Sequence, residues 1–198
     1  MPATTIAPVD LAKAYRLLNH GPTVLVSARH QGESNVMAAA WACALDFMPP
    51  KLTVVVDKMT RTRALIEGSG EFVIQIPTAA QAQLTHAVGT HSLSEQPDKL
   101  ERAGVQLLEF AGHDLPFVAG CSAWLACRLI PEPHNQQTYD LFIAEVVGAW
   151  ADTRAFADGH WQFENAAPIW RSLHYVAGGQ FYLTGDSLTV VDPTPPQP

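Results

Sequence analysis

Two short stretches of the sequence carry the residue types that could hold a flat, phosphorylated ligand. The first reads NVMAAAWA and begins at Asn35, whose amide offers a hydrogen-bond donor and an acceptor. It also contains Trp41, whose indole offers a flat apolar face. The small side chains of residues 38–40 would let a planar ring approach backbone N–H and C=O groups closely. A buried helical turn is the alternative interpretation of this stretch.

The second stretch reads DKMTRTR and follows an apolar run. It places Lys58, Arg61 and Arg63 among the hydroxyls of Thr60 and Thr62, where a strand ends and a helix begins. The first N–H groups of a helix lack partners and its dipole is positive there, so this is a candidate phosphate cradle. Taken singly, the first stretch is more typical of core packing, and the second of an N-cap with a solvated basic face. Their combination favours a nucleotide cofactor with a flat ring.

The elements that must position these stretches follow from local patterns along the chain. A short amphipathic helix is expected over residues 8–19, with Asp10 as its N-cap. The expected strands are residues 23–36, with a turn at Gly32, and residues 51–58, 71–77, 123–133, 139–152 and 178–186. Helices are expected over residues 60–70, stopped by Gly68, over residues 78–89, and over residues 98–104 inside an otherwise irregular segment.

Many β segments with a few short helices between them predict a mainly β fold, a small mixed barrel. The chain has 198 residues, no internal repeat and no long linker, so a single domain over residues 1–192 is expected. Residues 193–198 read PTPPQP and form a proline-rich C-terminal tail.

Composition excludes several classes of protein. The formal net charge is -7, and the basic residues are scattered, so nucleic acid is not an expected partner. No apolar stretch is long enough to span a bilayer and the N-terminus does not read as a signal peptide, which favours a cytoplasmic protein. Only 16% of the residues are charged against 47% hydrophobic, which favours a homo-oligomer, at least a dimer, that covers apolar surface.

Cysteine and histidine spacing gives no metal site. The three cysteines, Cys43, Cys121 and Cys127, are odd in number and form no CxxC pair, which argues against a disulfide framework or a structural zinc. His86 and His91 are five residues apart, which is not the spacing that places two ligands on one helix face.

The ordered set of motifs over residues 15–186 resembles the flavin reductase-like, FMN-binding split-barrel family, and most of all its flavoredoxin-like members. The pattern is Asn-x-Met, a small-residue run to Trp, Pro-Pro, an apolar strand, a Thr before a helix, and GEFVIQIP. The later pieces DKLERAG, YDLFIAEVV and HYVAGGQFYLTGD also fit. The resemblance implies a six-stranded antiparallel Greek-key barrel that works as a homodimer, with FMN near the subunit interface.

The resemblance also implies a function and a set of site residues. The chain would be an NAD(P)H-dependent flavin reductase that passes electrons from NADH or NADPH through bound FMN to free flavin, a metal complex or a protein acceptor. Because the cofactor performs the redox chemistry, no side chain is expected to act as a general acid or base. With Lys58 from the basic stretch, the candidate cofactor-binding residues are Asn35, Met37, Ala38, Ala39, Ala40, Trp41, Ala42, Lys58, Arg61, Thr62, Lys99, His174 and Phe181.

Within this set, Asn35 and Trp41 would flank the flavin, residues 37–42 would bind its edge through their backbone, and Thr62 with Arg61 would hold the phosphate. Two departures from the family pattern keep other functions open. Many relatives carry Thr or Ser where this chain has Ala38 and Ala39, and a histidine motif before the strand LFIAEVV is replaced by NQQTYDLF. The alternatives are a flavoredoxin-like electron carrier and a non-enzymatic FMN-binding protein.

Overall fold

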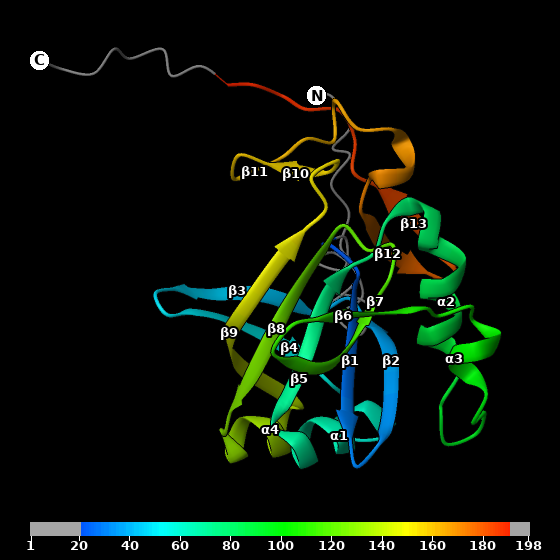
Figure 1. Cartoon of the computed structure of the whole chain (residues 1–198), viewed down its shortest axis with the longest axis vertical. Helices are drawn as coiled ribbons and strands as arrows, with labels where there is room; N and C mark the ends of the chain where they lie inside the picture. Colours follow the sequence, from blue (N-terminus) through cyan, green and yellow to red (C-terminus); the bar gives the residue numbers. More distant parts are fainter. Residues whose placement is uncertain (1–20, 191–198) are drawn as a thin grey trace, which may run out of the picture.

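The structure is a computed structural model, and it describes residues 21–190. The expected helix over residues 8–19 and the tail over residues 193–198 lie outside the described residues. Seven strands form one antiparallel sheet in the order β2-β1-β5-β8-β9-β4-β3 (Figure 1). These strands are β1 (Val24–His30), β2 (Glu33–Ala39), β3 (Ala42–Phe47), β4 (Pro50–Val55), β5 (Glu71–Ile76), β8 (Ala123–Ile130) and β9 (Leu141–Ala151).

The sheet closes on itself because of a bend between β2 and β3. These two strands are consecutive in the chain and only Ala40 and Trp41 separate them, yet they lie at opposite ends of the strand order. The carbonyl of Trp41 accepts a hydrogen bond from the Val55 N–H at 3.0 Å, which continues the β3–β4 pairing up to the bend. Counted as one bent strand, β2 and β3 give the six strands of the expected split barrel, and the mainly β fold is confirmed. The helical turn considered for the alanine run was wrong, since Ala38 and Ala39 are extended.

The helices are short, and most were expected. They are α1 (Arg61–Ser69), α2 (Ala82–Thr90), which follows the 3₁₀ turn η2 (Ala79–Gln81), α3 (Lys99–Arg102), α4 (Pro133–Tyr139) and the 3₁₀ turn η3 (Pro168–Trp170). The expected end of α1 at Gly68 was wrong. The helix ends at Gly70, which has φ 73° and donates its N–H to the Ile66 carbonyl at 2.8 Å. Gly68 stays helical, and a Cβ there would lie 2.6 Å from the His30 ring.

Three small hairpins accompany the sheet. They pair β6 (Leu107–Phe110) with β7 (His113–Val118), β10 (Phe156–Ala157) with β11 (His160–Trp161), and β12 (Leu173–Ala177) with β13 (Gln180–Leu183). The first lies in a segment expected to be irregular. Its pairing shifts register between Leu108 and Phe110, so the two-residue alternation that predicts a strand is broken there.

Two apolar clusters hold the fold together. Val26, Val54, Phe72 and Phe142 are fully buried inside the barrel. The opposite faces of β1 and β5 pack under α2 and β7, where Val88 belongs to the second cluster. Strands β1 and β5 are therefore buried on both faces and form a rigid part of the sheet. Helix α2 packs next to them, against the edge strand β2.

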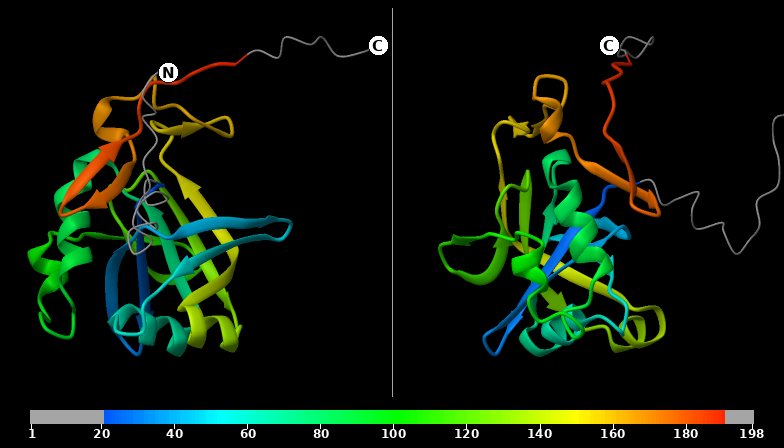
Figure 2. Two further views of the ribbon diagram at one scale, coloured as in Figure 1. Left: turned by 180° about the vertical axis from the view of Figure 1, so that it is seen from behind. Right: turned by 90° about the vertical axis from the view of Figure 1, so that its right-hand side faces the viewer.

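Two further features of the arrangement bear on function. The β12–β13 hairpin is fixed beside β1, because the Thr23 N–H donates to the Leu173 carbonyl at 2.7 Å and Thr23 Oγ1 accepts from the Tyr175 N–H at 2.8 Å. The β3–β4 hairpin projects sideways from the barrel (Figure 2) and carries Phe47 and Met48 with exposed fractions of 96% and 89%. Within residues 21–190, no helix has the length and apolar character needed to cross a membrane.

Candidate functional site

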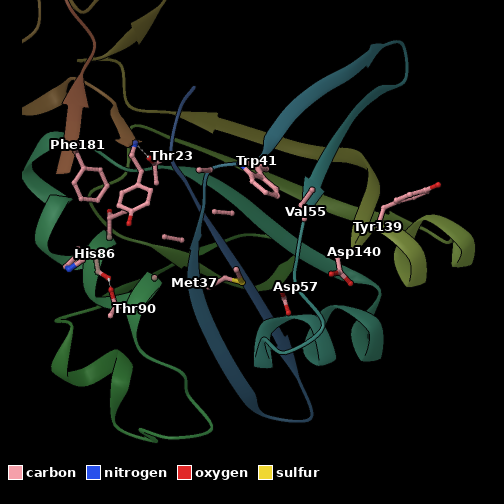
Figure 3. Close-up of a pocket in the computed structure, with 16 residues that line it drawn as sticks. Thr23, Met37, Trp41, Val55, Asp57, His86, Thr90, Tyr139, Asp140 and Phe181 are labelled. Carbon is pink, nitrogen blue, oxygen red and sulfur yellow. Dashed lines mark hydrogen bonds between the residues drawn. The ribbon is translucent and has the colours of Figure 1, made fainter. Parts of the chain in front are cut away.

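A cavity of about 460 Å³ lies between β2, α2 and the β12–β13 hairpin, and is called the ring chamber here (Figure 3). His86 and Thr90 of α2 lie on one side of it, and Tyr139 and Asp140, where α4 leads into β9, lie on the other. Its described lining residues are Thr23, Met37, Ala38, Ala39, Ala40, Trp41, Val55, Asp57, Thr85, His86, Gly89, Thr90, Tyr139, Asp140, Tyr175 and Phe181.

The ring chamber runs along the open edge of β2. Alternate side chains of a strand point to opposite faces, yet the four successive residues 37–40 all line this cavity. A cavity lined by consecutive residues at the end of a strand lies at the strand's edge, and β2 pairs with β1 alone in the described sheet. The unpaired backbone groups of the edge are therefore available to a ligand, and the three alanine methyl groups leave room to reach them.

Two aromatic rings close the chamber on the hairpin side. The rings of Tyr175 and Phe181 have centroids 5.3 Å apart, with their planes tilted by 58°. Trp41, at the bend between β2 and β3, lines the chamber and is half exposed. A flat aromatic ligand would find apolar faces on several sides and backbone polar groups along one edge, which is the usual composition of a small-molecule site.

A second cavity of about 260 Å³ adjoins the ring chamber and is called the anion chamber. The two share Met37, Asp57, Gly89 and Thr90 in their linings, so they are treated as two parts of one site. The described residues that line the anion chamber are Asn35, Met37, Asp57, Met59, Thr60, Arg61, Thr62, Val88, Gly89, Thr90, His91, Ser92, Leu93 and Lys99.

The N-terminus of α1 opens into the anion chamber. Thr60 precedes the helix in an extended conformation, but its hydroxyl does not cap the helix and donates instead to the Asp57 carbonyl at 2.7 Å. No acidic side chain occupies the first turn. The first backbone N–H groups of α1 are thus left without a side-chain cap, and the positive end of the helix dipole faces the cavity.

Lys99, from α3, brings a positive charge to the same cavity. It is only 4% exposed, and none of the ion pairs formed by the described residues includes it. Burial lowers the pKa of Lys99 to about 8, because the protonated form loses hydration. A mostly buried lysine without an ion-pair partner, beside an uncapped helix N-terminus, forms a candidate site for an anion.

Asn35 and Thr62 form the polar inner wall of the anion chamber. Both are buried, and Asn35 Nδ2 donates to Thr62 Oγ1 at 3.0 Å. Asn35 Oδ1 is buried without a hydrogen-bond partner. Buried polar atoms are nearly always paired in native proteins, so this oxygen fits a ligand that supplies a donor.

Arg61 is less free than the basic stretch suggested. Its Nε and Nη2 donate to the two carboxylate oxygens of Glu33 at 2.6 and 2.5 Å, and this bidentate pair holds the pKa of Glu33 below its usual value. The guanidinium keeps its remaining N–H groups for the chamber. Arg63 points elsewhere: it bonds to Asp140 and, at 2.7 Å, to the Gln136 carbonyl, and so ties α1 to α4.

Most of the residues singled out from the sequence come together in the two chambers. Three lie outside both linings: exposed Lys58, Ala42 at the start of β3, and His174 on β12. Next to His174, the ring of Tyr175 lines the ring chamber, because adjacent residues of a strand point to opposite faces. A role of these three in ligand binding stays a prediction.

Sequence reasoning missed the side chains that α2 and α4 bring to the ring chamber. Thr85 was read only as part of a helix, His86 only as part of a helix and as a rejected metal ligand, and Tyr139 and Asp140 only as the start of a strand. A helical face with Thr85, His86 and Gly89 at spacings of one, three and four residues gives no signal of its own. Their role follows only from the packing of α2 against β2.

Residues 16–177 match the family described as flavin reductase like domain, which is more than half of the chain. The chain belongs to the flavin reductase-like family. It is 71% identical to the FMN-binding domain of a flavin reductases-like enzyme from Shewanella baltica OS155. That structure has a TM-score of 0.85, and the match covers 93% of this chain and 97% of that one.

Two other proteins are similar to this chain over most of its length. The protein YddH of Escherichia coli strain K12 is 42% identical over 185 residues, covering 92% of this chain and 96% of YddH. The flavoredoxin of Desulfovibrio vulgaris (Miyazaki F) is 24% identical with a TM-score of 0.71, covering 96% and 94% of the two chains, and it shares the fold.

The electrostatics of this flavin reductase-like site differ between its two ends. Lys99, Arg61 and the α1 N-terminus bring positive charge to the anion chamber, although Glu33 pairs with Arg61 and Asp57 lines both chambers. The described lining of the ring chamber holds the carboxyl groups of Asp57 and Asp140 and includes no lysine or arginine. A ligand with a flat neutral ring at one end and an anionic group at the other matches this division.

Proposed function

We propose that this chain binds FMN without a covalent bond, with the isoalloxazine ring in the ring chamber and the phosphate in the anion chamber. In this proposal it is a flavin reductase that takes electrons from NADH or NADPH and passes them through FMN to free flavin, a metal complex or a protein acceptor. The observation that carries the proposal is the buried, unpaired Lys99 beside an uncapped helix N-terminus, in a cavity continuous with an aromatic-lined chamber.

The residues present fit each part of FMN. The unpaired backbone edge of residues 37–40 suits the heteroatom edge of the ring, and Trp41, Tyr175 and Phe181 suit its apolar faces. Thr62, Lys99 and the first N–H groups of α1 suit the phosphate, because all of them can donate to its oxygens. These assignments leave Arg61 in a supporting position, since Glu33 already takes one edge of its guanidinium.

The polar groups near the junction of the chambers fit the hydroxylated chain that links ring and phosphate. Asp57 lines both chambers, and Asn35 Oδ1 is a buried acceptor without a partner. Two acceptors would repel a phosphate but accept hydrogen bonds from the ribityl hydroxyl groups. This assignment explains why Asn35 is buried with one polar atom unsatisfied in the protein alone.

Bound FMN would supply hydride acceptance and onward electron transfer. The chain's own residues bind and orient it. In the proposal, the β2 edge fixes the orientation of the ring, and the aromatic side chains shield the adjacent part of the ring from water. Lys99 balances the charge of the phosphate. No described residue is assigned a proton-transfer role.

A homodimer is part of the proposal. Phe47, Met48 and Leu45 expose large apolar side chains on the projecting β3–β4 hairpin, and a monomer would leave this surface in water. Trp41, at the root of the same hairpin, lines the ring chamber. A second copy that packs on the hairpin would therefore lie close to the proposed cofactor.

A flavoredoxin-like electron carrier is the second candidate function. The observation that favours it is the lack of lysine and arginine among the described residues lining the ring chamber. A dinucleotide that stacked on the ring would need cations for its phosphates. As a carrier, the chain would exchange electrons with another protein rather than with NADH or NADPH.

Rapid mixing separates the two candidates. The FMN-loaded protein is mixed with NADH or with NADPH in the absence of oxygen, and the visible absorption of the flavin is followed. Bleaching within seconds at millimolar nucleotide supports the reductase. A spectrum that persists with both nucleotides, yet bleaches with dithionite, overturns the reductase and favours the carrier.

A further inference from the structure

Thr85 is a buried hydroxyl without a partner in the wall of the ring chamber. The residue is 1% exposed, it lines the chamber from α2, and its Oγ1 has no hydrogen-bond partner in the structure. A buried threonine inside a helix can satisfy its hydroxyl by donating to the carbonyl four residues before it. Thr90 of the same helix does so, with Oγ1 2.8 Å from the His86 carbonyl oxygen. Thr85 Oγ1 makes no such bond.

The other threonine hydroxyls of the chamber are already engaged. Thr23 Oγ1 accepts from the Tyr175 N–H at 2.8 Å, and Thr90 is bound to its own helix. Among the three threonines that line the chamber, Thr85 is therefore the one whose hydroxyl an incoming ligand finds unsatisfied. A buried hydroxyl without a hydrogen bond lowers the stability of the protein. Its presence in the wall of a cavity therefore points to a ligand that forms a hydrogen bond with it.

The strand beside α2 explains why such a hydroxyl is useful. Residues 37–40 line the chamber with a methionine and three alanines, so this segment can offer a ring hydrogen bonds through its backbone alone. Gly89, one turn after Thr85, lets α2 lie against β2, since a Cβ at Gly89 would be only 3.0 Å from the Ala38 Cβ. Thr85 is thus carried on a helix that packs tightly beside the alanine strand.

We propose that the Thr85 hydroxyl donates a hydrogen bond to a nitrogen or carbonyl oxygen of the planar ring bound in the ring chamber. The inference rests on the proposed function, in which that ring is the isoalloxazine of FMN. Thr85 would then select rings that carry an acceptor on the edge facing α2. The Thr85 hydroxyl would thus supply the side-chain hydrogen bond to the ring that the alanines of β2 cannot supply.

Titration of the ligand-free protein with FMN tests the inference through three variants. Thr85→Val keeps the shape and removes the hydroxyl, Thr85→Ser keeps the hydroxyl, and Thr138→Val makes the same change on exposed α4, outside both chambers. We expect Thr85→Val to weaken FMN binding about 2- to 10-fold, the loss of one hydrogen bond. Thr85→Ser and Thr138→Val should bind within about twofold of the wild type.

Thermal unfolding of the ligand-free variants separates ligand binding from a merely structural role. If Thr85 has no partner without ligand, Thr85→Val should keep or raise the melting temperature while it lowers FMN affinity. The bound flavin's visible absorption bands should also shift in Thr85→Val relative to the wild type.

A Thr85→Val protein that binds FMN as the wild type does, with the same spectrum, overturns the inference alone. A lower melting temperature with weaker binding that Thr85→Ser does not rescue also overturns it. A wild-type protein that does not bind FMN overturns the proposed function with it.

Discussion

Gly89 of α2 and Ala38 of β2 are in such close contact that a Cβ at position 89 would lie 3.0 Å from the Ala38 Cβ. Both residues line the ring chamber, and Gly89 also lines the anion chamber. The missing side chain of Gly89 therefore sets the distance between helix and strand at the point where the two chambers join.

Gly89→Ala should lower FMN affinity by about tenfold, because the added methyl group must displace either α2 or β2 at this junction. Its effect on stability should be small. Overpacking costs about 1–3 kcal/mol, but alanine is favoured over glycine in a helix interior by about 1 kcal/mol. FMN titration and thermal unfolding check the two parts. Gly185→Ala is the control, since a Cβ there meets nothing within 4 Å. Equal FMN affinity in both variants would contradict the assigned junction.

Lys99→Gln should weaken FMN binding about 10- to 100-fold, the loss of a charge-assisted hydrogen bond worth about 1.5–3 kcal/mol. Riboflavin, which has no phosphate, should bind the variant and the wild type alike. Exposed Arg102, which lies on the same helix α3 and outside both chambers, provides the matched control as Arg102→Gln. Equal losses of FMN and riboflavin affinity in Lys99→Gln would argue for general disruption of the site instead.

The pKa of Lys99 predicts opposite pH trends for ligand binding and for folding. In the free protein its pKa is lowered to about 8 by burial, against about 10.4 in an unfolded chain. FMN affinity should fall as the pH rises above about 8 and the ammonium loses its proton, with no matching fall for riboflavin. Between about pH 8 and about pH 10.4 the unfolded chain binds this proton and the folded chain does not, so this group makes stability rise with pH.

FMN titrations from pH 7 to pH 9.5 and urea unfolding of the ligand-free protein over the same range check these trends. In Lys99→Gln the fall in FMN affinity above pH 8 should largely disappear. A slope that persists unchanged in the variant would assign the titration to another group.

Phe47→Glu should shift the protein from a dimer toward a monomer, because it places a charge at the tip of the apolar β3–β4 hairpin. Sedimentation velocity at micromolar concentration measures the shift. Ile169→Glu, which alters a partly exposed residue of η3 far from the hairpin, is the control. A Phe47→Glu protein that sediments like the wild type would show that the hairpin tip is not the dimer contact.

Local patterns were enough to predict the parts of the site that are local in the chain. Asn35 and the alanine run lie on one strand and its bend, and Thr62 follows directly from a helix N-terminus. Both stretches could be read because residue type and spacing alone determine what their backbone can offer a ligand. The order of motifs along the chain then predicted the split barrel.

The parts that could not be predicted depend on contacts between distant segments. Thr85 becomes a site residue only because Gly89 lets α2 lie on β2, and Tyr175 only because Thr23 fixes the β12–β13 hairpin. The engagement of Arg61 by Glu33, which lies 28 residues earlier, likewise has no local signal. That Arg61 holds the phosphate together with Thr62 stays a prediction, with one edge of the guanidinium already bound by Glu33.

Equilibrium binding of FMN and of riboflavin to the wild-type protein tests the central claim most directly, because the two ligands differ only in the phosphate. The two-chamber assignment predicts about one FMN per subunit. It predicts riboflavin binding at least about tenfold weaker, since riboflavin leaves Lys99 and the α1 N-terminus without an anion. Equal affinity for the two ligands would contradict the anion chamber, and no binding of either would contradict the proposed function as a whole.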